Sequence, residues 1–558
     1  MRLDAPVSKE YFEEADCSIQ FGHIDEPVTS TTTCNSDLTK KGLETRWHHI
    51  LSPWNTTHGR PFPDEPIANG AIGQSLVAVD VQPLSMGLTS AVTSDYELIS
   101  PQHPSVGDTL HYHLFAKDAN GRARHRGGDF WYAVLQTPKL KASTAARIVD
   151  HDNGTYSLYF LAGWAGKVQV YVTLVHPSEA VDYLRGSFRH EEKKVQWEGL
   201  FTSPERTENS LCWVAYSGEW SKVCEYRPVR ALFQTRILCS QPPSLPCDTL
   251  RGLRGTTTYR NQFERVLPRE KAYLFQEGYV HAKLRFSSSV TIQVTHEGSK
   301  VLDRKLLPLP TCQPDLPITL SDGFWYGNHW HSLVCSSQVE FSSPSIRSCL
   351  KHRNVFFTGD STTRQWFSAV VKALGISKPE DNQFKNKSFY LERRDTQSDI
   401  NFKFIFHPLS LHPHAVFVNL SVVRFEADVL LGLPRDSCNH VVVFSPWAHF
   451  PNYPWRSYLE WLVGVRDALL VARKRCPDLK FVVKTPHPVN MQQEMKARDW
   501  MFYQMRAAMW DAFSGVGALF VDTWDMNLSY PSAPSNMHMP DKVISEEISL
   551  FLSHLCSR

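Results

Sequence analysis

The 558-residue sequence has almost no net charge. Lys and Arg together number 59 and Asp and Glu together number 57, which leaves a formal charge of +2. A chain without an excess of one sign creates no broad field that would attract nucleic acid or an anionic membrane surface. We therefore expect no nucleic acid among the partners of this protein.

Long apolar runs are also missing. No stretch reaches the roughly 18 consecutive apolar residues that a membrane-spanning helix needs. The first residues, MRLDAPVSKEYFEEADC, lack the apolar core of a secretory signal. The sequence therefore predicts no transmembrane segment in this chain.

Motifs for nucleotides and metal ions are absent too. The sequence contains no Gly-x-x-x-x-Gly-Lys-Ser/Thr loop, no Gly-x-Gly-x-x-Gly after a predicted strand and no Cys-x-x-Cys pair. Two His-x-His pairs, His111/His113 and His412/His414, could each place two ligands on one face of a strand, but neither has an evident third ligand. We expect no bound metal and no tightly bound cofactor.

Twelve cysteines are present. Their even number and wide spacing fit either the disulfides of an exported protein or scattered buried thiols. Glycosylation sequons favour the first interpretation. They occur at Asn55, Asn153, Asn386, Asn419 and Asn527. We expect a disulfide-bonded glycoprotein of the secretory pathway, in the Golgi lumen or secreted, whose signal or anchor segment is missing from this sequence.

The first part of the chain reads as a polar segment followed by a β domain. Residues 1–65 are Thr-rich, show no sustained periodicity and predict a leader or stalk. Residues 66–185 hold short alternating runs, such as LHYHLFAKD and VQVYVTLVH, which predict an antiparallel sandwich. The segment ARIVDHDNGTYSLYFLAGWAGKVQVYV resembles the filamin-type immunoglobulin repeat, in which Asp-Asn-Gly-Thr-Tyr closes a hairpin.

The composition and the hydrophobic pattern change in the second part of the chain. Residues 186–345 combine six cysteines with Pro-rich links and strand-like runs, and we interpret them as a cysteine-bearing β linker region. In residues 346–558, β-branched apolar runs alternate with segments of 3.6-residue periodicity. This pattern predicts an α/β domain of the doubly wound type, in which chemistry takes place at the carboxyl ends of the strands.

One candidate nucleophile lies at such a strand end. Ser361 follows a predicted strand over residues 354–358 and opens a helix, in the sequence NVFFTGDSTTRQW. Its hydroxyl would lie near the positive end of the helix dipole and near free backbone N–H groups. The alternative is structural, because Ser is also a favoured helix cap. Position alone leaves both interpretations open.

A candidate base lies in the segment VDTWDMNLSYPSAPSNMHMPDKVI. His538 follows a long polar loop and precedes the last predicted helix, so we expect it at the same sheet edge as Ser361. Asp522 or Asp525 could orient its imidazole. Ser, Asp and His in this order can supply a nucleophile, an orienting carboxylate and a base. A single loop His is otherwise a solvated or structural residue.

Several motifs together carry a family resemblance. FFTGDSTTRQW, GFWYGNHWHSLVCSS, SCLKHRN, WAHFPNYP, VDTWDMNLSY and SNMHMPDKVI are the segments concerned. The chain beyond residue 70 thereby resembles the neurexophilin and PC-esterase domain family. This resemblance implies a neurexophilin-type sandwich followed by a PC-esterase domain related to the GDSL/SGNH hydrolases.

The resemblance also implies roles for individual residues. Ser361 corresponds to the nucleophile, with Asp360 beside it, and His538 corresponds to the catalytic histidine. Asp360, Arg364, His449 and Asn536 are the candidates for oxyanion or substrate binding. For Arg364 and His449 the alternative is a structural pairing with a nearby carboxylate, and the sequence leaves both interpretations open.

Two positions depart from the family pattern. Ser535 stands where many SGNH enzymes have Asp, so Asp522 or Asp525 would have to orient His538, or the Ser–His pair would act alone. Trp447-Ala448 replaces a common Gly-Gln, which removes a candidate oxyanion donor.

Two functions follow from these observations. The first is a glycan O-acetyltransferase or acetylesterase, with sialic acids among its candidate acceptors and acetyl-CoA as its candidate acyl donor. The second is a catalytically inactive, secreted binding or adhesion protein of neurexophilin type, whose sandwich recognises an extracellular protein partner. The retained Ser361 and His538 favour the first function, and the two departures favour the second.

Overall fold

The computed structural model describes residues 87–556 with several gaps. The gaps are 193, 195, 216–221, 228–234, 257–258, 277, 285–290, 317–318, 377–389, 409–416, 422, 436–437 and 490–497. Several sequence predictions therefore lie outside the described residues. These are the 1–65 leader, Cys17, Cys34, Asn55, Asn386, His412 and His414.

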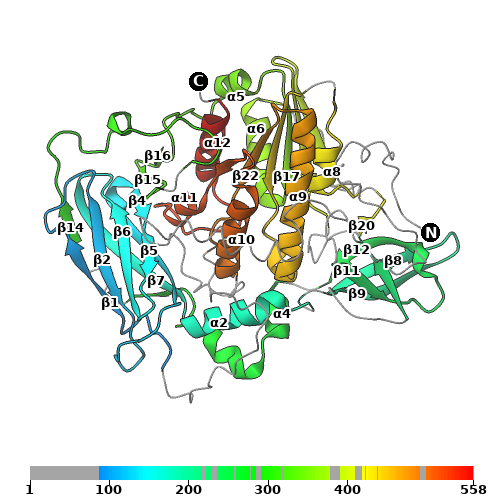
Figure 1. The fold of residues 1–558 in the computed structure, drawn as a ribbon, viewed down its shortest axis with the longest axis horizontal. Helices are drawn as coiled ribbons and strands as arrows, with labels where there is room; N and C mark the ends of the chain where they lie inside the picture. The colour runs from blue at the N-terminus through cyan, green and yellow to red at the C-terminus, as the bar shows by residue number, and fades with distance from the viewer. Residues whose placement is uncertain are drawn as a thin grey trace.

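The chain is a mixed α and β protein with several domains (Figure 1). In the described part of the chain, the strands form four sheets. Two of these sheets lie on the left of Figure 1, a sheet with helices lies at the centre, and a further sheet lies on the right. The central part carries the candidate site.

Two sheets pack face to face as the N-terminal sandwich. The first contains, in spatial order, β1 (Asp95–Ser100), β2 (Thr109–Phe115), β6 (Thr155–Leu161) and β5 (Arg147–Asp150). The second contains β13 (Ala282–Lys283), β7 (Gly166–His176), β3 (Phe130–Thr137), β4 (Ala142–Ala145), β15 (Gly323–Tyr326) and β16 (His329–Ser332), and β14 (Thr291–Val294) also pairs with β7. Alternate residues such as Leu110 and Leu114 of β2 and Val170 of β7 share one buried core, as expected for half-buried strands.

The sandwich uses more of the chain than residues 66–185. Its larger sheet is extended by β13, β14, β15 and β16, which lie within the segment predicted as a linker. These strands are only two to four residues long. Their pairing partners lie far away in the sequence, so local periodicity does not reveal them.

The remaining part of the cysteine-bearing region forms the third sheet. Its order is β10 (Val223–Tyr226), β11 (Arg236–Ser240), β9 (Thr207–Ala215), β8 (Gln196–Thr202), β12 (Leu250–Gly255) and β20 (Val418–Asn419). Cys212–Cys239 crosses between β9 and β11. The edge strand β20 comes from the α/β part, so the third sheet is also linked to the central domain.

The central sheet is parallel except for one edge strand. Its order is β18 (Tyr390–Asp395), β19 (Ile400–Phe406), β17 (Asn354–Gly359), β21 (His440–Ser445), β22 (Lys480–Lys484) and β23 (Leu519–Val521). Only β18 runs antiparallel to its neighbour. The apolar strand sequences fit this position, because a parallel sheet is buried on both faces.

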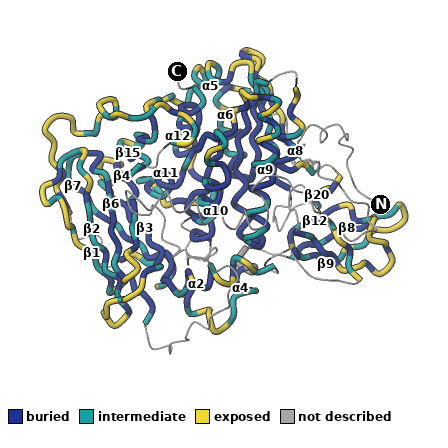
Figure 2. The backbone as a smooth tube through the Cα atoms, viewed as in Figure 1, coloured by how far each residue is buried: buried dark blue, intermediate teal, exposed yellow. Residues whose placement is uncertain are grey.

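Helices cover both faces of this sheet. α8 (Glu426–Leu431), α9 (Trp455–Arg475) and α10 (Arg498–Phe513) share a core with Val442 and Phe444 of β21. α5 (Ser343–Leu350), α6 (Ser361–Ala373) and α12 (Asp541–Leu555) pack against Val441 and Val443, the alternate residues of the same strand. β21, in the middle of this sheet, is buried along its whole length, and Figure 2 shows the strands at the centre of the molecule as mostly buried. The predicted alternation of strand and helix is therefore present.

All cysteines in the described part of the chain form disulfides. The pairs are Cys212–Cys239, Cys224–Cys247, Cys312–Cys335, Cys349–Cys556 and Cys438–Cys476. The prediction of disulfides is confirmed, and disulfides are compatible with a protein of the secretory pathway. Among the described residues, no helix has the length and apolar character of a membrane span.

Candidate active site

Ser361 lies at the point where the strand order of the central sheet reverses. β17, which precedes it, is flanked by β19 on one side and by β21 on the other. The connections after β17 and after β19 therefore run to opposite faces of the sheet. At such a switch point a crevice forms at the carboxyl ends of the strands. Ser361 is the first residue of α6 and has 8% exposure.

The turn before Ser361 requires glycine. Gly359 has a φ of +148°, and a Cβ atom there would lie 2.5 Å from the Ser445 carbonyl oxygen and 2.6 Å from Thr363 Oγ1. No larger residue fits between β17 and β21 at this point. The tight approach carries the chain from the strand directly into the helix that begins with Ser361.

Asp360, and not Ser361, caps the helix. The buried Asp360 carboxylate accepts hydrogen bonds from Thr362 N at 2.8 Å and from Thr362 Oγ1 at 2.7 Å. Its second oxygen accepts from Ala448 N at 2.8 Å and from Trp447 N at 3.3 Å. The interpretation of Ser361 as the cap is therefore wrong, and the Ser361 hydroxyl is left for another contact.

That contact is with His538. Ser361 Oγ lies 2.8 Å from His538 Nε2, although the two residues are 177 positions apart in the chain. The His538 side chain remains exposed on the loop before α12. The distance is within the range for proton transfer between a hydroxyl and a general base.

The environment favours neutral His538. Partial desolvation lowers the pKa of its imidazole, the Asp360 carboxylate raises it, and the Arg364 guanidinium lowers it again, with a net effect below the ordinary value. The ring is therefore unprotonated at neutral pH, and Nε2 can accept the hydrogen bond from Ser361 Oγ. Arg364 is half-buried one helical turn after Ser361.

Neither predicted orienting carboxylate reaches His538. Asp522 accepts from Arg506 Nε at 2.8 and 2.9 Å and from Trp510 Nε1 at 2.9 Å, which occupies it in a buried ion pair. Asp525 lies on α11 (Trp524–Leu528), which turns it toward the sandwich and Arg147, at 3.9 Å. The expectation that one of them orients the imidazole is not met, because both carboxylates form ion pairs with arginines.

The loop that carries His538 is held from two sides. His487 follows β22 and donates from Nε2 to the Asn536 carbonyl at 3.0 Å, while Gln365 of α6 donates to the Met539 carbonyl at 3.0 Å. Burial, and then the charge of Lys484, hold the pKa of His487 well below its usual range. A neutral His487 with its proton on Nε2 therefore fixes the backbone two residues before His538.

The predicted Asn536 and His449 side chains make local contacts. Asn536 is exposed, and its Oδ1 accepts from Met537 N at 2.7 Å. His449 is buried, and its Nδ1 lies 2.7 Å from Nε2 of His407, whose backbone N–H donates to Gly359 O at 2.8 Å. The buried histidine pair thus lies beside the turn that precedes Ser361.

His407 and His487 also lie at this edge, and no sequence motif predicted them. Both follow a strand of the central sheet, in FKFIFHP and KFVVKTPHPV, and strand ends converge at one edge of a parallel sheet. Their position after these strands could have indicated that both histidines lie near the candidate site. Neither residue stands in a recognisable motif.

The three sequons in the described part of the chain differ in their exposure to solvent. Asn153 and Asn419 are exposed, and each Oδ1 accepts a hydrogen bond from the sequon hydroxyl two residues later. Asn527 is fully buried and donates from Nδ2 to Glu547 Oε1 at 2.7 Å. The prediction of glycosylation at Asn527 is wrong for the folded protein, because a glycan has no room there.

The His111/His113 pair faces other side chains of the sandwich. His111 Nε2 lies 2.9 Å from Ser157 Oγ, and its ring stacks on Tyr159. Within the described part of the chain, no group of three or more His, Cys, Asp or Glu side chains is arranged to hold a metal ion.

Two family models match the chain. The model described as "NXPE family member 4-like, C-terminal domain" matches residues 330–556, which include Ser361 and His538. The model described as "Neurexophilin" matches residues 111–266, which include most of the sandwich and of the third sheet. Both parts implied by the sequence motifs occur in the expected order, and the chain belongs to the neurexophilin and PC-esterase domain (NXPE) family.

Proposed function

We propose that the protein is a glycan O-acetyltransferase or acetylesterase that acts through an acyl-Ser361 intermediate. The observation that carries the proposal is the 2.8 Å contact between Ser361 Oγ and His538 Nε2 at the carboxyl edge of the sheet. A nucleophile within hydrogen-bond reach of a neutral base is the minimal arrangement for acyl transfer. The "NXPE family member 4-like, C-terminal domain" match over the same residues supports it.

The fold supports the same assignment. The order β19-β17-β21-β22-β23, with Gly-Asp-Ser after the first strand of the domain, agrees with a GDSL/SGNH-type hydrolase domain. We assign the sandwich to the immunoglobulin or filamin type on its two antiparallel sheets around one core.

The reaction would proceed in two steps. His538 Nε2 removes the Ser361 hydroxyl proton as Oγ attacks the acyl carbonyl, and the resulting imidazolium of His538 then returns the proton to the departing group of the donor. Backbone N–H groups at the start of α6 would stabilise the oxyanion. In the second step, an acceptor hydroxyl gives its proton to His538 and attacks the acyl carbon. The bond between this carbon and Ser361 Oγ then breaks, and His538 returns the proton to Oγ. Water instead of a sugar hydroxyl gives hydrolysis.

The donor and the acceptor are part of the proposal. Acetyl-CoA is our proposed donor, with its thiol as the departing group, and sialylated glycans are our proposed acceptors. Arg364 lies close enough for its charge to act on His538, so it can attract an anionic group next to the reacting atoms. Asn536 is exposed on the His538 loop and could contact the same substrate. We place the reaction in the lumen of the secretory pathway, in agreement with the disulfides.

A second candidate function is binding without catalysis. No carboxylate of the described residues contacts His538, and the Trp447 and Ala448 amides already donate to Asp360. These observations favour a secreted binding protein of neurexophilin type, in which the α/β domain has lost its activity and the sandwich holds an extracellular protein.

One experiment separates the two functions. The purified protein is incubated with acetyl-CoA and sialylated glycans, and acetyl transfer is followed by mass spectrometry with an acyl-enzyme trap on Ser361. We expect transfer with the natural chain and a loss of at least about 10³-fold in Ser361→Ala, as when a nucleophile is removed. No acyl-enzyme and no transfer from any acetyl donor would support the binding function.

A further inference from the structure

We propose that the N-terminal sandwich positions His538, so that the α/β domain is not a self-sufficient catalytic unit. This inference rests on the proposed function. The β15–β16 hairpin of the sandwich sheet holds both ends of the segment that carries His538. Trp325 and Ser532 are the positioning residues that we single out, because they join the hairpin to this segment.

The upstream end is held in the protein interior. Trp325 on β15 is fully buried and donates from Nε1 to the Met526 carbonyl at 2.8 Å, and its ring meets Tyr530 edge-on at 5.0 Å. On the neighbouring strand β4, Ser143 Oγ donates to the Ser529 carbonyl. The sandwich therefore binds the backbone on both sides of the end of α11.

The hairpin turn holds the next part of the loop. Ser532 Oγ donates to Asn328 Oδ1 at 3.0 Å, and Asn328 lies in the turn between β15 and β16 with a φ of +64°. Ser532 precedes His538 by six residues. The turn thus contacts the loop six residues before His538.

The downstream end meets the same hairpin. His329 is the first residue of β16. Its Nδ1 atom lies 3.3 Å from Glu546 Oε1 and 3.3 Å from Lys542 Nζ, and both of these residues are on α12. α12 begins three residues after His538. The hairpin therefore contacts the chain before and after the loop, although it is remote in sequence.

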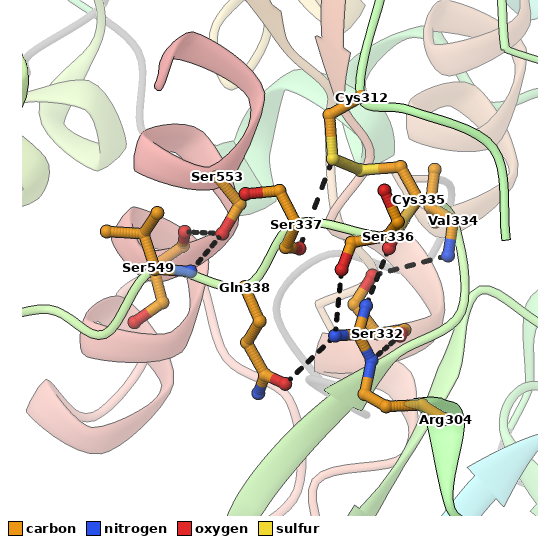
Figure 3. The surroundings of a disulfide bond; sticks show 11 residues. Arg304, Cys312, Ser332, Val334, Cys335, Ser336, Ser337, Gln338, Ser549 and Ser553 are labelled. Atoms are coloured by element: carbon orange, nitrogen blue, oxygen red, sulfur yellow. Dashed lines mark hydrogen bonds between the residues drawn. A yellow bond between two sulfur atoms is a disulfide. The ribbon is translucent and has the colours of Figure 1, made fainter. Parts of the chain in front are cut away.

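The hairpin itself is fixed. Trp325 is paired with Ser143 in the sandwich sheet. Figure 3 shows the guanidinium of Arg304 directed at the chain that leaves β16, where it donates to the carbonyls of Ser332 at 2.9 Å and Cys335 at 2.6 Å beside the Cys312–Cys335 disulfide. A few residues later, Val339 N donates to Ser553 Oγ of α12 at 2.7 Å. The hairpin cannot shift without disturbing these contacts.

This arrangement substitutes for a missing carboxylate. In a triad, the acid holds the imidazole in place through its second nitrogen. Here, no described residue bonds that nitrogen of His538, so the ring position depends on the backbone of its loop. His487 and Gln365 hold the loop from the α/β side, and the hairpin holds its origin from the sandwich side.

The test uses a fluorophosphonate probe on the full chain, because this probe reacts with an activated serine and needs neither donor nor acceptor. The rate constant for labelling at Ser361 and the final labelled fraction are measured by intact mass from pH 5 to 9. We expect Trp325→Phe, which removes only the indole N–H and some ring volume, to reduce the rate constant by about 10- to 100-fold, as small misplacements do. The acid limb that His538 causes should flatten at the same time.

Trp330→Phe is the matched control. Trp330 is buried beside Trp325, with ring centroids 5.6 Å apart, but within the described residues no hydrogen bond joins it to the segment that carries His538. It should label like the natural chain. Ser532→Ala, at an exposed site, should slow labelling several-fold with an unchanged melting temperature, and it decides the matter if Trp325→Phe does not fold.

The outcomes separate the two levels of the proposal. Natural protein that is not labelled at Ser361 would refute the proposed function itself. Natural protein that is labelled, with Trp325→Phe and Ser532→Ala equal to it in rate constant and pH profile, would refute the positioning role. A variant that loses only labelled fraction, at an unchanged rate constant, would also refute it, since that result reports unfolding.

Discussion

At the scale of residues, the candidate site depends on a histidine without a carboxylate partner. Asp360 influences His538 only through its charge, because its two oxygens accept from Thr362, Trp447 and Ala448. Arg364 acts with the opposite sign. The protonation of His538 is therefore set by two nearby charges and by partial desolvation.

The pH dependence of the site follows from these charges. The pKa of His538 lies below its usual value, so reaction at Ser361 should persist at mildly acidic pH and fall as His538 becomes protonated. Asp360→Asn removes the charge that favours the protonated ring, so the acid limb should move to lower pH. Arg364→Gln removes the opposing charge and should move it to higher pH.

Fluorophosphonate labelling of Ser361 across pH measures both shifts without a substrate. His538→Ala is the control, and it should have no acid limb in this range. Shifts of the same sign in Asp360→Asn and Arg364→Gln would contradict the electrostatic explanation.

At the scale of elements, the strand-to-helix turn positions Ser361. Gly359 has a positive φ and no room for a Cβ atom between Ser445 and Thr363. The other end of the same helix provides a comparison, because Gly375 has a φ of +68° in open space. The two glycines separate backbone strain from steric clash.

Gly359→Ala should destabilise the protein by at least about 3 kcal/mol, the sum of backbone strain and overpacking. Gly375→Ala carries the strain alone and should cost about 1 to 2 kcal/mol. Urea unfolding of both variants measures the difference. Equal losses would show that the close approach of β17 and β21 contributes nothing.

The elements also show what sequence can predict. The alternation of apolar strands and 3.6-periodic helices after residue 346 indicated a parallel sheet covered on both faces, because such strands cannot face water. Motif order indicated that Ser361 and His538 belong to one site. The hairpin Gly323–Tyr326 and His329–Ser332 could not be assigned to the sandwich, since its pairing partner, Ser143, lies about 180 residues away. The directions of Asp522 and Asp525 depend on arginines contributed by other elements.

At the scale of the whole molecule, a buried charge cluster joins the sandwich to the α/β part. Arg147 on β5 lies 3.4 Å from Asp322 and 3.9 Å from Asp525, and Arg506 on α10 also faces Asp322, at 3.9 Å. Burial, with Asp525 nearby, raises the pKa of Asp322 to about 7. The raised pKa means that its contribution to stability is largest at low pH and is lost as the pH rises toward 7.

Arg147→Met should therefore destabilise the protein in a pH-dependent manner. Removing Arg147 takes away one of the two cations that face the buried Asp322 carboxylate, at a cost of about 3 to 5 kcal/mol when the carboxylates are ionised. The loss should be greatest at pH 8 and smaller at pH 5, where Asp322 is protonated. Chemical denaturation at both pH values measures it.

Arg126→Met is the matched control, because the ion pair with Asp182 at 2.6 Å is exposed. It should cost less than about 1 kcal/mol at either pH. A loss in Arg147→Met that is independent of pH would contradict the assignment of Asp322 as the titrating group.

The Cys349–Cys556 disulfide has a consequence for the α/β domain as a covalent object. It joins α5, just before β17, to the residue that directly follows α12, 207 positions later. Ser361 and His538 both lie within the ring that this bond closes. A single break of the chain between them would therefore leave the candidate nucleophile and the candidate base in one molecule, so that proteolytic cleavage of a surface loop need not separate the two residues.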